Sequence, residues 1–258
     1  MRIASRYQAH DSVLHRFDPR LKVVVAVLLI VGVVMTPDRA WVAFLLIWLM
    51  EIGLCRLGRV AWWRVGRMAG IALPFTLAAV TLLFSTPGPT LIHIGGVEIS
   101  ENGLIRFGAI VARSWLAVQF ALLLSMTTRF DQLLWALHWW RLPPPLVSII
   151  GLMVRYLYTL ADEAERLLQA RAARSGALDG RRSGGSVLWR AKTAGGMVGN
   201  LFLRSYERGE RVYMAMVARG YTGQMLLLDA PPLTRRAVLL GCVPLVVMVG
   251  IQIGARVW

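Results

Sequence analysis

The chain has 258 residues, 57% of them hydrophobic, and a mean hydropathy of +0.57. This composition is too apolar for an ordinary soluble domain, and the apolar residues gather in long runs, which is typical of a membrane protein. The formal charge of +15 fits two classes, a nucleic-acid-binding protein or a membrane protein with basic cytoplasmic loops. The distribution of charge along the chain therefore has to decide between them.

Five apolar runs predict an all-α integral membrane protein with about five transmembrane helices. Four runs are shorter than the roughly 20 residues that a perpendicular span needs, but flanking Arg and Trp side chains can reach the interface. The first two runs could instead form a tight helical hairpin. The expected spans cover residues 23–35, 41–54, 69–84, 104–126 and 238–253.

Two features flank these spans. Asp18-Pro19, just before the first span, predicts a helix start with basic anchors at the membrane interface. The loop over residues 86–103 contains no Lys or Arg, and within it LIHIGGVEIS predicts two short strands around Gly95-Gly96. We expect a β-hairpin near residues 90–100 that caps the outer face.

The basic residues indicate the orientation. If the N-terminus is cytoplasmic, 25 of the 29 Lys and Arg residues lie inside, in residues 1–22, 56–67 and 129–236. Membrane proteins concentrate positive charge in their cytoplasmic loops, so this orientation is favoured. The same pattern argues against a nucleic-acid partner, because the charge follows the membrane topology.

The long inner segment predicts a helical module. FDQLLWALHWW is a Trp-rich amphipathic stretch suited to a membrane interface, and RLPPPL ends it. Apolar spacing then predicts a helix from Leu146 to near Arg174, and a Gly/Ser/Arg loop separates it from a second long helix over about 187–219. The predicted domains are a four-span membrane domain (1–128), this cytoplasmic module (129–234) and a fifth transmembrane helix (235–258).

The two long helices end alike. Arginine in a last turn and a glycine after it are favourable at any helix end, but this capping does not require a Glu-Arg pair two turns earlier. Two equivalent ends predict two equivalent receptors, and a guanidinium between small residues suits paired hydrogen bonds to a carboxylate in a groove. The residues that align at an offset of 45 are Glu165 and Glu210, Arg166 and Arg211, Ala170 and Ala215, Ala173 and Ala218, and Arg174 and Arg219.

These residues carry a resemblance. The motifs Ala173-Arg174-Ser175 and Ala218-Arg219-Gly220, with DSVLHRFDPRLK, MVRYLYTLADEAERL and ERVYMAMVARGY, resemble the transmembrane coupling (T) subunit of an energy-coupling factor (ECF) transporter. The cobalt-type subunit, CbiQ, is the most similar, over nearly the whole chain. The family commonly has Ala-Arg-Gly in both motifs, whereas here Ser175 takes the last position of the first and glycine follows at Gly176.

The resemblance implies a non-catalytic coupling subunit of a cobalt importer in the bacterial cytoplasmic (inner) membrane. Two ABC-type ATPase subunits would each grip one arginine end, and their ATP-driven motion would pass to a separate substrate-binding membrane subunit. The cargo could equally be nickel or a vitamin, because the choice of cargo would lie in another polypeptide. The residues implied to bind ATPases are Ala173, Arg174, Ser175, Ala218, Arg219 and Gly220, with Glu165, Arg166, Glu210 and Arg211 as supporting residues.

The sequence offers little for a chemical site. It has no GxxxxGK[ST] motif, and its four histidines (His10, His15, His93 and His138) form no ligand cluster. We therefore expect no catalytic residue, metal site or cofactor. A stand-alone membrane enzyme or channel would need polar groups converging within the spans, for which only Glu51 and Arg113 are candidates. Arg113 should face protein, in an internal hydrogen-bonding role or at a contact with the substrate subunit.

Overall fold

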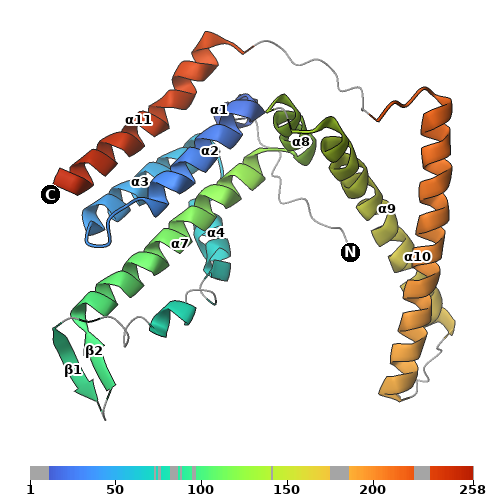
Figure 1. The fold of residues 1–258 in the computed structure, drawn as a ribbon, viewed down its shortest axis with the longest axis horizontal. Helices are drawn as coiled ribbons and strands as arrows, with labels where there is room; N and C mark the ends of the chain where they lie inside the picture. Colours follow the sequence, from blue (N-terminus) through green and yellow to red (C-terminus); the bar gives the residue numbers. More distant parts are fainter. Residues whose placement is uncertain are drawn as a thin grey trace. The chain divides into compact units, whose positions relative to one another are not determined.

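The computed structural model describes residues 12–72, 74, 77–81, 87, 89–94, 97–140, 142–174, 186–223 and 233–257 (Figure 1). The chain divides into two compact units. The bundle unit takes Arg6–Ala136 and Asp229–Trp258, and the helix-pair unit takes Met1–Ser5 and Leu137–Leu228. The predicted domain boundaries stay a prediction, because they separate membrane from cytoplasmic segments and the structure contains no membrane.

The described residues are predominantly helical, as predicted. The bundle unit contains α1 (Val13–Arg16), α2 (Pro19–Val34), α3 (Trp41–Leu57), α4 (Trp62–Ala69), short 3₁₀ turns at Gly70–Ala72 and Leu77–Val80, strands β1 (Thr90–Ile94) and β2 (Val97–Ser100), α7 (Glu101–Thr127), α8 (Phe130–Trp139, at the boundary) and α11 (Arg235–Val257). β1 and β2 pair antiparallel, which confirms the predicted hairpin, although its turn at Gly95-Gly96 lies outside the described residues. The helix-pair unit contains α9 (Pro144–Arg174) and α10 (Val187–Ala218).

Side-chain caps explain where several helices begin. The Asp18 carboxylate accepts a hydrogen bond from the Arg20 backbone N–H at 2.9 Å, and Pro19 occupies the first helical position of α2. This confirms the predicted helix start. The Ser100 hydroxyl caps α7 in the same way by accepting from the Gly103 N–H.

Two apolar clusters hold the bundle unit together. The first joins α2, α3, α7 and α11, and the second joins α3, α4 and α7. At Gly32 an added Cβ would lie 2.5 Å from the end of the Met248 side chain, so α11 packs closely on α2 there. The first cluster comprises Leu29, Val33, Phe44, Ile47, Ala109, Leu116, Phe120 and Met248.

The third predicted span differs from the structure. Within residues 69–84, the described residues form the end of α4, two separate 3₁₀ turns and helical positions at Pro74 and Thr81, not one continuous α-helix. Gly70 directly follows α4, and Pro74 has no backbone N–H to donate to a helical ladder. The apolar run therefore did not predict the break in the helical backbone.

Three described helices are long and apolar enough to cross a membrane: Glu101–Thr127, Pro144–Arg174 and Arg235–Arg256. The first and last contain the predicted fourth and fifth spans. α2 and α3, with 16 and 17 residues, coincide with the first two predicted spans and are shorter, as expected. α9 was predicted as cytoplasmic, yet its apolar N-terminal part meets the same criteria of length and composition.

The basic residues at the start of α2 are buried, which the prediction of interfacial anchors missed. The Lys22 ammonium donates a hydrogen bond to the Thr127 carbonyl at 2.9 Å, at the C-terminal end of α7. The Arg20 guanidinium lies over the Trp135 ring, 3.9 Å from its centroid. A cation at the carbonyl end of a helix is favourable, so Lys22 joins α2 to α7.

Arg113 faces protein, as predicted. Its guanidinium donates to the Thr36 carbonyl and pairs with the Asp38 carboxylate at 2.6 Å. The same region ties in α11, because the Gln252 amide donates to the Gly32 carbonyl at 2.6 Å and to the Thr36 hydroxyl at 2.8 Å. This polar cluster joins the end of α2 to both α7 and α11.

Replacing Arg113 with Gln should destabilise the bundle. The variant loses the ion pair with Asp38 and the hydrogen bond to Thr36, at a cost of about 1–3 kcal/mol, because hydrogen bonds to charged groups contribute about that much. Thermal unfolding of the purified chain in detergent measures the effect. The control is Arg106→Gln, which removes a longer (3.8 Å), more exposed contact to the same Asp38 and should cost under about 1 kcal/mol. Equal losses of stability in the two variants would contradict this view of the cluster.

Candidate functional site

The predicted site lies on the two helices of the helix-pair unit. α9 and α10 cross where the Arg204 guanidinium donates to the Glu163 carboxylate at 2.8 Å. Leu160, Leu201 and Ser205 lie around this ion pair, in the lining of a cavity of about 180 Å³. Since the helices contact each other in this region, the ion pair marks the point about which they are joined (Figure 1).

Local sequence sets the start of both helices. α9 follows Pro143, whose carbonyl accepts the Leu146 N–H at 2.9 Å, and the run Pro143–Pro145 suits a helix start because proline lacks the N–H that a helix interior needs. The Ser186 hydroxyl caps α10 by accepting the Trp189 N–H at 3.3 Å. Both helices then run for more than 30 residues, as the apolar spacing predicted.

The C-terminal end of α10, which we call its tip, is closed by a glycine. Gly220 has φ +83°, and its N–H donates to the Val217 carbonyl at 2.9 Å, while the Tyr221 N–H donates to the Met216 carbonyl at 3.0 Å. These two bonds make the Schellman ending, in which a left-handed residue closes the last helical turn. They place Arg219 at the helix cap, with an exposed side chain, and Ala218 as the last helical residue.

The tip of α9 is described only in part. Arg174 is its last helical residue, and Ala173 and Arg174 are both exposed. Ser175 and Gly176 lie outside the described residues. Each helix thus ends on an exposed arginine preceded by an exposed alanine, as the alignment at an offset of 45 predicted.

The supporting Glu-Arg pairs lie between the crossing and the tips. Glu165 and Arg166 lie two and three residues after Glu163 on α9, and Arg211 lines the cavity at the crossing. Arg166 and Arg211 each precede a tip arginine by eight residues, roughly 12 Å along a helix. The repeat therefore places each Glu-Arg pair at the same distance from its own tip arginine.

The crossing gives the pair the geometry of two levers. Arg174 lies 11 residues beyond Glu163, and Arg219 lies 15 residues beyond Arg204, so the arms are roughly 16 and 22 Å long. Beyond the crossing the two helices continue in diverging directions, and their arginine ends are far apart (Figure 1). Such an arrangement can transmit a force applied at either tip to the crossing.

The helix pair leaves much apolar surface uncovered. No residue of α10 is buried, and large apolar side chains along it are more than half exposed, among them Phe202, Tyr206 and Met214. A patch of this extent on a described helix marks a surface for a protein partner or for lipid. Flexible methionine side chains suit a surface that adapts to what covers it.

The two candidates for an intramembrane chemical site do not converge. Arg113 pairs with Asp38, which precedes α3, whereas Glu51 lies ten residues into α3, roughly 15 Å along its axis. Glu51 is buried, and neither of its carboxylate oxygens has a hydrogen-bond partner among the described residues. Among those residues, no three His, Cys, Asp or Glu side chains gather as metal ligands.

The sequence reasoning missed the ion pair at the crossing and the partner of Arg113. Glu163 and Arg204 lie 41 residues apart, and Asp38 and Arg113 lie 75 apart, so no local spacing connects them. A charge on the apolar side of a long helix is a weak signal by itself. Pairing requires the fold.

Comparison with known proteins identifies the family. The profile of the cobalt transport protein family, CbiQ, matches residues 10–227. The energy-coupling factor transporter transmembrane protein EcfT of Streptococcus thermophilus is 30% identical over 236 residues, covering 86% of this chain and 85% of that protein. EcfT of Bacillus subtilis is 28% identical over 231 residues (86% and 85%), and an uncharacterised protein of Methanocaldococcus jannaschii is 27% identical over 230 residues (85% and 75%). The match confirms the resemblance drawn from the arginine helix ends: the chain belongs to the CbiQ family of ECF transporter transmembrane (T) subunits.

Proposed function

We propose that the chain is the non-catalytic coupling subunit of an ECF importer, and that its two arginine tips each dock in one of two ABC-type ATPase subunits. The observation that carries the proposal is the pair of exposed arginine ends, Arg174 and Arg219, at the far ends of two helices joined at one crossing. A guanidinium flanked by small residues enters a groove and pairs with carboxylates or carbonyls there. The small neighbours at the tips are Ala173, Ser175, Ala218 and Gly220.

Motion would pass through the crossing. When the ATPases close, they displace both tips, and the ion pair between Glu163 and Arg204 keeps the arms moving as one body. Glu165, Arg166, Glu210 and Arg211 lie on the arms between the crossing and the tips, where they support this transmission. The uncovered apolar surface of α10 supplies area for a second partner, the substrate-binding membrane subunit.

The cargo we propose is a divalent metal ion, cobalt. The family description, cobalt transport protein, supports it, while the EcfT relatives carry no cargo in their names. Nickel or a vitamin is the alternative, because the cargo would be bound by the substrate subunit and not by this chain.

The proposed location is the bacterial cytoplasmic membrane with the N-terminus inside. α9 then lies along the inner surface instead of crossing. If it crossed, the 13 basic residues of 166–236 would lie outside, against the preference for positive charge on the cytoplasmic side. Exposed Trp139 and Trp140, at the end of α8 and directly after it, suit the membrane interface.

Reversing the charge of both tips should release the ATPases. In Arg174→Glu with Arg219→Glu, each end loses a buried charge-assisted contact, and removing one partner of such a contact costs about 2–5 kcal/mol. Affinity should fall by at least about thirtyfold for each tip. Co-purification of the co-expressed ATPases with the tagged chain from membranes measures this loss.

The matched control is Arg155→Glu with Arg190→Glu, which places the same charge change on each helix far from its tip. It should retain the ATPases. Full retention by the tip double variant, in chain that is inserted in the membrane at normal amounts, would refute the docking proposal.

Breaking the Glu163–Arg204 ion pair at the crossing should uncouple ATP hydrolysis from uptake of cargo without releasing the ATPases. Glu163→Arg and Arg204→Glu each place like charges at the crossing, so ATP hydrolysis should continue while uptake of cargo falls. The exchange of both residues together restores an attractive pair and should restore uptake. Uptake per ATP hydrolysed in proteoliposomes is the measurement, and a double exchange no better than the single variants would count against a pivot at this ion pair.

The proposed orientation, with the N-terminus inside and the C-terminus outside, can be tested with fused reporter proteins. Green fluorescent protein inserted in the segment 175–185 should be fluorescent, because that segment is cytoplasmic. Alkaline phosphatase fused after Trp258 should be active, because the C-terminus is outside. An active phosphatase at 175–185 would show instead that α9 crosses the membrane.

A further inference from the structure

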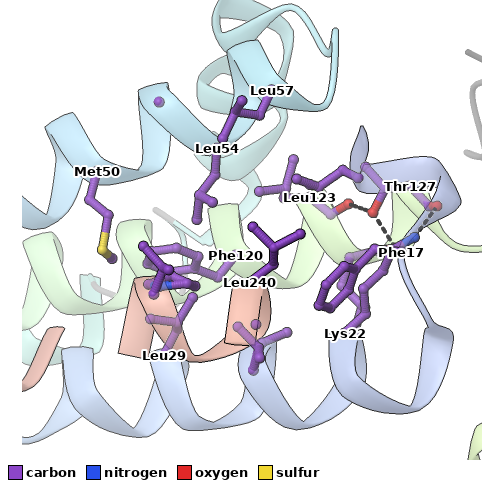
Figure 2. A pocket seen from close by; sticks show the side chains of 18 of the residues that line it. Phe17, Lys22, Leu29, Met50, Leu54, Leu57, Phe120, Leu123, Thr127 and Leu240 are labelled. Carbon is purple, nitrogen blue, oxygen red and sulfur yellow. Dashed lines mark hydrogen bonds between the residues drawn. The ribbon is translucent and has the colours of Figure 1, made fainter. Parts of the chain in front are cut away.

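The bundle unit contains an apolar groove on the inner halves of its helices. α2, α3, α7 and α11 enclose a volume of about 370 Å³, within the roughly 300–1,000 Å³ of small-molecule sites (Figure 2). Leu29, Leu54, Phe120, Leu123 and Leu240 point into it from these four helices. The groove is therefore shaped by the same helices that form the core, and it is a fixed feature of the unit.

The groove opens on the outer surface of the unit. Leu57, Leu240 and Val243 line it and are each more than half exposed. On the α3 side, a Cβ added at Gly53 would meet nothing within 4 Å. In a membrane-spanning unit, apolar side chains exposed in this way face lipid, so acyl chains have direct access to the groove.

The charged residue that lines the groove is basic. Lys22 is the single charged residue among those that line it, and its ammonium makes one described hydrogen bond, to the Thr127 carbonyl (Figure 2). Arg235 and Arg236 are exposed at the start of α11, and Arg236 is four residues before Leu240, roughly 6 Å along the helix. None of the described residues that line the groove is acidic, and Asp18, four residues before Lys22, caps α2 by accepting from the Arg20 N–H.

We propose that this groove holds an acyl chain of one anionic phospholipid, with the phosphate against Arg235 and Arg236. An apolar lining open to the bilayer suits the chain, and two arginines with no acidic lining residue suit a negative headgroup over a zwitterionic one. The lipid fills the space that α11 leaves against α2, α3 and α7. This inference goes beyond the coupling role and does not depend on it.

The test uses the full-length chain in nanodiscs of phosphatidylcholine that contain a trace of phosphatidylglycerol with a photoactivatable acyl chain. After irradiation, mass spectrometry of peptides locates the label. We expect it to concentrate on residues 50–57 and 240–247. The same probe with a phosphatidylcholine headgroup should label these segments several-fold less.

Two variants separate a site from general lipid contact. Gly53→Leu fills the groove and should lower labelling of these segments by about fivefold or more, since the added side chain takes the space of the lipid chain. The matched control is Gly250→Leu, also on a membrane helix with open space around it but outside this groove, and it should label normally. Both variants are first checked for single-peak elution and unchanged thermal stability.

A second pair of variants tests whether Arg235 and Arg236 bind the lipid headgroup. Arg235→Gln with Arg236→Gln should reduce phosphatidylglycerol labelling to the phosphatidylcholine level, whereas Arg64→Gln with Arg67→Gln should leave it unchanged. Label spread evenly over the exposed helices, labelling insensitive to Gly53→Leu, or equal labelling by the two headgroups would each overturn the proposal.

Discussion

The single crossing of α9 and α10 is the constraint on which the proposed function depends. α10 has 32 residues and no buried side chain, and the buried residues of α9, Val147 and Ser148, lie near its start. The described parts of α9 and α10 therefore share no buried core that would fix their positions. Their mutual placement comes from the contact around Glu163 and Arg204, and the rest of their surface is available to other molecules.

The bundle unit is held in a different way. Its helices share two apolar clusters, and polar contacts at the helix ends fix their register. Lys22 donates to the Thr127 carbonyl at the end of α7, and Arg113 and Gln252 both donate to Thr36 at the end of α2. In a medium without water, each such contact is hard to replace, so the unit is specified by a few polar groups as well as by apolar packing. The bundle unit thus has a core of its own, whereas the helix-pair unit leaves most of its surface available to other molecules.

Much of this architecture was predictable from the sequence, because helices and turns are local. Apolar runs predicted four of the helical spans, Asp18-Pro19 predicted the start of α2, and Gly220 predicted the end of α10. The arginine ends were found because they repeat at a fixed offset. Their docking partners stay a prediction, because they lie in other chains.

The failures of prediction were of two kinds. Hydropathy does not encode backbone continuity, so the run at 69–84 was expected to be one helix although Gly70–Ala72 and Leu77–Val80 form 3₁₀ turns. Contacts between distant segments have no local signature. Asp38 as the partner of Arg113 and Trp135 as the partner of Arg20 required the fold itself.

The glycine ending of α10 has a consequence for how this sequence can vary. Gly220 closes the helix one residue after Arg219, and each residue of a helix turns its side chains by about 100° around the axis. An insertion or deletion between Arg204 and Arg219 would therefore swing the guanidinium to another side of the rod, even if every remaining residue were kept. Between Arg204 and Arg219, substitutions therefore disturb the direction of the Arg219 side chain far less than insertions or deletions do.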